Sequence, residues 1–111
     1  MAEANFTGGC PVEADYTPTS GNVAAGTVVV LTNTCGVAHR DITNNTLGSL
    51  AVGGGVYRVV SLSNFAAGTK VYWDDTNNKV SNVSTNNTAF GFLIETPSGA
   101  NTVAQVLHWP F

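Results

Sequence analysis

The stretch GTKVYWDDTNNKV, residues 68–80, decides how the chain is expected to fold. An apolar and aromatic run, Val71-Tyr72-Trp73, leads into two acids and a group of amides, and a second run begins at Lys79. Asp and Asn side chains hydrogen-bond to nearby backbone amides in turns and tolerate left-handed backbone. The pattern therefore predicts a β-hairpin. The residues expected to shape its turns are Gly68, Asp74, Asp75, Asn77 and Asn78.

The adjacent carboxylates of Asp74 and Asp75 could also suggest a metal site. Neighbouring residues of a strand point to opposite faces, so the two acids converge only if the chain turns there. A calcium loop also needs a central Gly and a later Glu, and the stretch DDTNNKVSNVST at 74–85 contains neither. We expect a structural turn here, with no metal and no cofactor.

The rest of the chain repeats this strand-and-turn pattern. From Val23 onward, short runs rich in Val, Tyr, Phe and Thr alternate with Asn, Gly and Asp clusters, which is typical of β-strands. Strands about ten residues apart favour a single small antiparallel β-barrel or β-sandwich. Residues 1–22 show no period and are expected to form an extended, irregular N-terminal arm, with the β-domain at 23–111. The predicted strands are Thr27–Thr32, Thr46–Val52, Val56–Leu62, Thr69–Trp73, Lys79–Val83, Ala89–Glu95 and Thr102–Trp109.

One internal echo links the two halves of the sequence. AAGTVVVLTN at 24–33 is matched by AAGTKVYWDD at 66–75, and each is followed by a Gly that opens another apolar run, Gly36 and Gly91. The Gly within each AAGT allows the positive φ that such a turn can need. We expect both strands to enter the sheet in the same way.

The composition argues against several classes of function. Only 10% of the 111 residues are charged, and four Lys and Arg residues with a net charge of -3 form no basic patch for nucleic acid or an anionic membrane. There is no apolar run of about 18 residues that would span a membrane. The start, MAEANFTGGC, does not resemble a signal peptide. In a chain used inside a cell, Cys10 and Cys35 are expected to be reduced more often than paired.

No group of residues predicts catalysis. His39, Arg40 and Asp41 are consecutive, whereas a nucleophile, a base and an orienting group must converge in space. Neither His39 nor His108 has a partner at a zinc-like spacing. The glycines at 53–55 match no phosphate-binding pattern and are interpreted as a flexible turn or a bulge. We expect no catalytic residue and no enzyme.

The segment from Ala66 to Trp109 resembles a family of small bacteriophage capsid cement, or decoration, proteins. The string VYWDD followed by Lys79-Val80 carries the likeness, with Gly91 and a Ser-Gly loop after it. Upstream, GTVVVLTNTCGVAHRDI and GGVYRV resemble the earlier strands of that family. The likeness covers about residues 22–109.

The resemblance implies a protein made in the host cytoplasm that sits on the outer surface of the assembled phage head and bridges major capsid protein subunits. Such proteins bind as symmetric clusters, which implies a homotrimer, with a dimer as the alternative. The competing hypothesis is a carbohydrate-binding or adhesive β-module that stacks sugars on its aromatic side chains. The candidate interface residues are Trp109, Pro110, Phe111, Tyr72 and Trp73.

Overall fold

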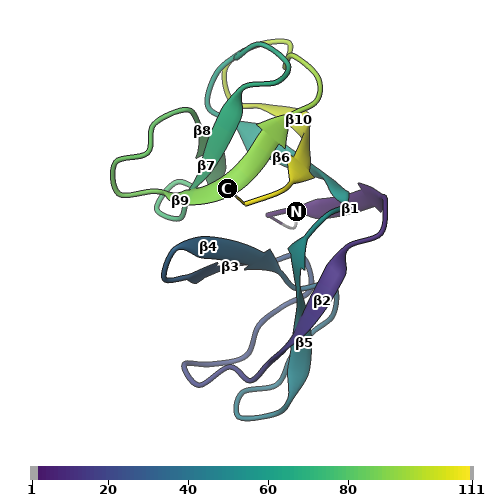
Figure 1. Cartoon of the computed structure of the whole chain (residues 1–111). Helices are drawn as coiled ribbons and strands as arrows, with labels where there is room; N and C mark the ends of the chain where they lie inside the picture. Colours follow the sequence, from purple (N-terminus) through teal and green to yellow (C-terminus); the bar gives the residue numbers. More distant parts are fainter. Residues whose placement is uncertain (1–2, 111) are drawn as a thin grey trace.

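The structure, a computed structural model, describes residues 3–110 as ten strands in two sheets, and it confirms the predicted all-β fold (Figure 1). Within these residues no helix is long and apolar enough to cross a membrane. The strands are β1 (Asn5–Gly8), β2 (Val12–Tyr16), β3 (Val28–Leu31), β4 (Thr34–Val37), β5 (Gly48–Gly53), β6 (Val56–Ser61), β7 (Lys70–Asp74), β8 (Lys79–Ser81), β9 (Thr88–Leu93) and β10 (Thr102–His108).

The larger sheet has six strands in the order β1-β6-β10-β9-β7-β8. Its neighbours are antiparallel, and one additional parallel pairing, Ser61 with Val80, joins β6 to β8. That pairing curls the sheet toward a barrel. The smaller sheet has the order β2-β5-β4-β3 and is antiparallel throughout. The two sheets form a sandwich-like globule, with the larger one in the upper part of Figure 1.

The β1–β2 segment and the β5–β6 segment each pass from one sheet to the other, and they lie side by side. The β1–β2 segment pairs first with β6 of the larger sheet and then with β5 of the smaller one. Glycines sit where the two segments bend, and a Cβ added to Gly9 would lie 2.9 Å from the Cα of Gly55. Both residues have positive φ, 91° and 85°. This close backbone approach explains the glycines that sequence analysis interpreted only as a flexible turn or bulge.

The prediction of an irregular arm at residues 1–22 is wrong for β1 and β2, which are regular strands paired within the two sheets. Most of their side chains are exposed, and β1 and β2 are only four and five residues long, although Val-Glu-Ala-Asp-Tyr in β2 does alternate apolar and polar residues. Backbone pairing with β6 and β5 holds them in place. The alternation within β2 is the local signal that could have identified it, whereas β1 carries no such signal.

Strand β4 is absent from the predicted strand ranges, although the repeated pattern places an apolar run at Gly36, within it. Three of its four residues are fully or almost fully buried, so it too lacks alternation. Gly36 lies in its middle because a Cβ there would come within 2.9 Å of the Leu50 side chain. All seven predicted strands are present, with ends that differ by up to two residues.

The main core lies between the sheets. Its largest fully buried side chains are Trp73, Tyr57 and Phe90. Burying one aromatic side chain of this kind removes roughly 150–250 Å² from water, or about 4–6 kcal/mol in gross terms. A second, smaller cluster of Ala38, Ile42 and Leu50 supports the smaller sheet.

The AAGT echo corresponds to two units with the same backbone geometry, here called the first unit (residues 24–41) and the second unit (residues 66–96). In each, the Thr N–H donates to the carbonyl of the first Ala over 3.1 Å. The Gly has positive φ, 85° at Gly26 and 92° at Gly68, and its N–H donates to a neighbouring chain segment over 2.6 Å. The acceptors are the carbonyl groups of Ala38 and Leu93. Both strands therefore enter their sheets in the same way, as the sequence predicts.

Candidate functional site

The turn between β7 and β8 uses its acids internally. Asp74 Oδ1 accepts the backbone N–H groups of Thr76 (3.0 Å) and Asn77 (3.1 Å), and its Oδ2 accepts the side-chain amide of Asn77 (2.9 Å). The Asn77 side chain is the main reason that the pKa of Asp74 is lowered. Asp75 Oδ1 instead accepts the indole N–H of Trp73 (2.9 Å), and Asn78 has a left-handed φ of 55°. Each carboxylate is thus engaged with a different part of the hairpin.

The hairpin aromatics have opposite environments. Trp73 is fully buried, so its prediction as an interface residue is wrong: its ring packs against Phe90, with centroids 6.1 Å apart. Tyr72 is half-buried and makes interactions within the chain. Because Trp73 is enclosed, it cannot form a sugar-stacking platform with Tyr72 and Trp109.

The chain leaves the sheet at its C-terminal end with an exposed aromatic residue. Trp109 is 58% exposed, although its backbone N–H still donates to Phe90 O (3.1 Å), and Pro110 is partly exposed. Phe111, which completes the predicted interface, lies outside the described residues. The exposed indole makes Trp109 the strongest of the predicted contact residues.

The outer face of the larger sheet adds apolar residues that sequence analysis did not single out. We define the outer patch as Val60, Leu62, Ile94 and Val103. Val103 pairs directly with Val60, and the three outermost side chains are 36–47% exposed. The alternation of buried and more exposed residues along β10 is the signal that could have identified its outward face.

A buried imidazole connects the two sheets. His108, on β10, is fully buried and its Nε2–H donates to the carbonyl of Cys35 on β4 (2.8 Å). Its Nδ1 is buried without a hydrogen-bond partner. Burial is the main cause that lowers the pKa of His108, so the neutral ring is favoured.

A second polar contact between the sheets lies beside it. Tyr57 Oη on β6 is 2.6 Å from His39 Nε2, just after β4. Burial, and secondarily the charge of Glu13, raise the pKa of Tyr57, so the phenol stays neutral. The ring of Tyr57 meets those of His39 and His108 edge to face, with centroids 5.6 and 5.7 Å apart. Both histidines therefore serve in the contact between the layers.

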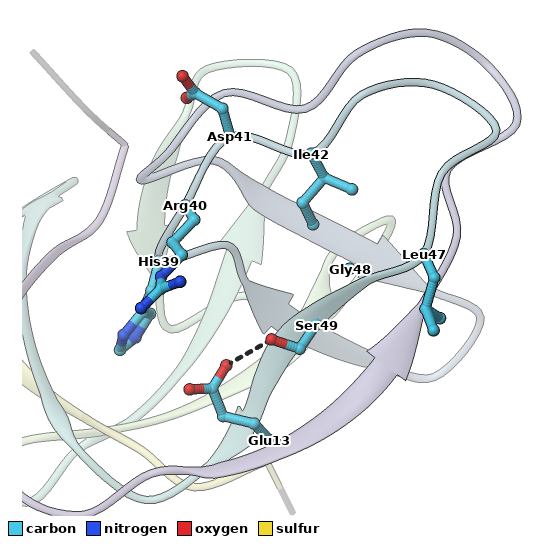
Figure 2. A pocket seen from close by; sticks show the side chains of 8 residues that line it. All are labelled: Glu13, His39, Arg40, Asp41, Ile42, Leu47, Gly48 and Ser49. Atoms are coloured by element: carbon cyan, nitrogen blue, oxygen red, sulfur yellow. Dashed lines mark hydrogen bonds between the residues drawn. The ribbon is translucent and has the colours of Figure 1, made fainter.

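A polar hollow of about 420 Å³ lies beside His39, and Figure 2 shows the side chains around it. Glu13 Oε1 accepts the hydroxyl of Ser49 (3.1 Å). Asp41 Oδ1 accepts the backbone N–H of Ala25 (2.8 Å). In Figure 2 the carboxylates of Glu13 and Asp41 lie on opposite sides of the hollow and do not converge. The lining residues are Glu13, His39, Arg40, Asp41, Ile42, Leu47, Gly48 and Ser49.

The consecutive residues His39, Arg40 and Asp41 diverge, with His39 directed to the core and Asp41 to the turn of the first unit. Within residues 3–110, no three His, Cys, Asp or Glu side chains are grouped closely enough to hold a metal ion. The two cysteines are unpaired: Cys10 is exposed and Cys35 is buried. The polar and titratable side chains of the hairpin and of the contact between the sheets are thus mainly engaged in turns and in the core, whereas Trp109 and most of the outer patch are exposed.

These features describe a small all-β protein whose exposed apolar side chains, not a group of converging polar residues, are the candidate functional site. A comparison with protein families matches the phage cement proteins over residues 12–108. The chain therefore belongs to the phage cement protein family, a family of structural proteins that act as capsid cement. No curated protein and no solved structure matches the chain.

Proposed function

We propose that the protein binds the outer surface of the assembled phage head and bridges neighbouring major capsid protein subunits, acting as a homotrimer. Membership of the cement family supports a capsid role. The outer location, the bridging and the trimer are the steps that we add. Their support comes from the surface of the larger sheet.

The observation that carries the proposal is the exposure of Trp109 at the end of β10. A Trp side chain offers roughly 150–250 Å² of contact area, and here more than half of it faces solvent. Tryptophan is enriched among the residues that dominate binding energy at protein interfaces. The outer patch lies on the same sheet and provides further apolar area. We assign Trp109 to the contact with the shell or with a neighbouring copy.

Bridging would stabilise the shell by mass action. A ligand that binds the assembled lattice but not the dissociated subunits adds RT ln(1 + [L]/Kd) to the stability of the assembly, or about 2.7 kcal/mol at a hundredfold excess over Kd. A trimer presents the same contact three times, which raises the effective affinity without any new contact. Few surface charges suit a role that depends on apolar and hydrogen-bonded contacts.

The test uses phage heads assembled without this protein. Purified protein is mixed with such heads and, separately, with free capsid subunits, and binding is measured by co-sedimentation. We expect binding to the heads alone, together with a higher melting temperature of the decorated heads. Binding to free subunits only, or no change in head stability, would contradict the proposal.

Two variants locate the contact. Trp109→Ala should fold normally and lose most of its binding to heads, because its indole is exposed in the free chain. Leu47→Ala is the matched control, because Leu47 is also exposed, at 67%, but lies directly before β5 of the smaller sheet. Native mass spectrometry of the free protein tests the trimer, with the dimer and the monomer as the contrary outcomes.

A further inference from the structure

The residues just before β1 lie against the edge of β3, the last strand of the smaller sheet. Glu3 Oε1 accepts the backbone N–H of Val28 (2.8 Å). The N–H of Ala4 donates to the carbonyl of Gly26 (3.0 Å), and Ala4 is almost fully buried in the main core. We call Glu3 and Ala4 the strap. The family match begins at residue 12, after the strap, and so assigns it no role.

The Glu3 carboxylate binds the side of β3 that faces away from β4. The Thr27 carbonyl accepts from the N–H of Ala38, so Thr27 faces β4, and alternate residues of an antiparallel strand face the same side. Val28 therefore faces the open side, and so does Val30 by the same alternation. Because β3 has four residues, these two are its outward-facing positions. With Val28 bonded to Glu3, Val30 alone is left for a further strand.

Strand β3 lacks the protection that the edge strands β1 and β2 carry. Proteins protect exposed edges with bulges, charges or proline, or cover them with a loop. The pairing of β1 and that of β2 each contain a register shift, and β2 also carries Glu13 and Asp15. Strand β3 has the sequence Val-Val-Val-Leu and a regular register. The strap is therefore what supplies a charge and a cover at this edge.

The other oxygen of Glu3 connects the strap to the larger sheet. With the Asn78 amide oriented so that its nitrogen faces these acceptors, that nitrogen lies 3.1 Å from Glu3 Oε2 and 3.1 Å from the carbonyl oxygen of Asp75. Asn78 belongs to the β7–β8 turn, so one carboxylate joins the edge of the first unit to the hairpin of the second. Because both of its oxygens accept hydrogen bonds, the carboxylate is held over the edge of β3.

We propose that the strap closes the edge of β3 and prevents a second copy of the chain from adding to it. An uncovered edge of uncharged residues can pair with the same edge of another copy. A carboxylate accepts hydrogen bonds but donates none, so it cannot continue the alternating pattern that a new strand needs. Each copy would also bring its own Glu3 charge to such a contact. The inference concerns the free protein and does not depend on how the protein binds phage heads.

Hydrogen exchange, measured by NMR on the unmodified protein, tests the cover directly. Val28 and Val30 both face the open side, and the N–H of Val28 donates to Glu3. The Val28 amide should therefore exchange at least about tenfold more slowly than the Val30 amide. Equal rates for the two amides would overturn the inference. This measurement requires no substitution, so it still decides the matter if a variant does not fold.

Sedimentation velocity of the free protein tests the effect on self-association. Glu3→Ala removes the carboxylate, and its average mass should be about twofold or more above that of the unmodified chain at the same concentration. Glu13→Ala is the matched control, because it removes one carboxylate from β2, whose pairing keeps its register shift. This control should sediment like the unmodified chain. Adding Val30→Lys to Glu3→Ala places a charge at an exposed position of the edge, and should restore the mass of the unmodified chain.

Two sedimentation results would overturn the inference. If folded Glu3→Ala has the same average mass as the unmodified chain, the strap does not guard the edge. If the larger species persist after Val30→Lys is added, the association uses another surface. Neither result would bear on the binding of the unmodified protein to phage heads, which is measured separately.

Discussion

The substitution Gly91→Ala tests the close backbone approach between β9 and β10. Gly91 lies on β9 opposite His108 of β10. A Cβ at this position would lie 1.8 Å from the Leu107 carbonyl oxygen and 2.8 Å from the Trp109 nitrogen. Both obstacles are backbone atoms, so no side-chain rotation can relieve the clash. An ordinary carbon–oxygen contact is about 3.3–3.6 Å, so the strands must separate locally by roughly 1.5 Å.

Such a separation exceeds what a backbone hydrogen bond tolerates. The bond from Trp109 N–H to Phe90 O, now 3.1 Å, would be lost, and so would a bond of the adjoining β9–β10 ladder. Each buried polar group left without a partner costs about 1–3 kcal/mol, so two lost bonds predict a loss of about 2–6 kcal/mol. That is a large fraction of the total stability of a typical domain, about 5–15 kcal/mol.

The assay is urea unfolding followed by tryptophan fluorescence, which reports the exposure of the buried Trp73. Gly99→Ala is the control, because a Cβ at Gly99 meets nothing within 4 Å and its φ is not in the left-handed region. We expect Gly99→Ala to stay within about 0.5 kcal/mol of the unmodified chain. A Gly91→Ala protein within 1 kcal/mol of the unmodified chain would refute the close approach of β9 and β10.

Three further predictions concern the titratable groups. Replacing both Asp74 and Asp75 by Ala should lower the unfolding free energy by about 1–2 kcal/mol, because the hydrogen bonds of the turn are lost. Added calcium should leave the melting temperature of the unmodified chain unchanged. A rise in the melting temperature of the unmodified chain, with none in the double variant, would indicate a metal site. Because the pKa of His108 is lowered from 6.5 in the fold, the unfolded chain binds the extra proton first, so stability should be full above about pH 6.5 and fall as the pH drops below it. In urea titrations from pH 7 to 5, His108→Phe should weaken the dependence of the unfolding free energy on pH, with the neighbouring groups His39, Tyr57 and Cys35 retained. An unchanged dependence in the variant would assign the pH effect to another group. Burial, with a smaller effect of Asp75, raises the pKa of Cys35 to about 12. A thiol reagent at pH 8 should therefore modify Cys10 alone until urea unfolds the chain. Rapid labelling of both thiols in the folded protein would contradict the buried position of Cys35.

Where local chemistry determines the structure, the sequence alone was sufficient to predict it. The β7–β8 turn follows from acids and amides that bond to the backbone within three residues, and the two AAGT turns follow from a glycine with positive φ. Short apolar runs between turn residues predict seven of the strands. These signals are all contained within about ten neighbouring residues.

Where structure depends on distant partners, the same reasoning failed. Strands β1 and β2 are mostly exposed and are held by backbone pairing with β6 and β5, and the short alternation of residues 12–16 in β2 is their one local signal. Strand β4 is enclosed, so it has no polar face to alternate with. His108 gave no signal of its buried position, because its partner, the carbonyl of Cys35, is 73 residues away in the chain.

The two tryptophans show the same limit at the candidate site. Each is the last residue of a predicted strand, and both are predicted as possible contact residues. Trp73 lies within β7, on the face that turns toward the smaller sheet, and Asp75 binds its indole N–H at the rim of the core. Trp109 lies one residue beyond β10, before Pro110, where pairing ends and the side chain is no longer tied to either face. Burial is thus decided by which face of a strand meets the second sheet, and exposure by where the ladder stops. Because β10 ends just before Trp109, the indole is left exposed, where a neighbouring protein can contact it.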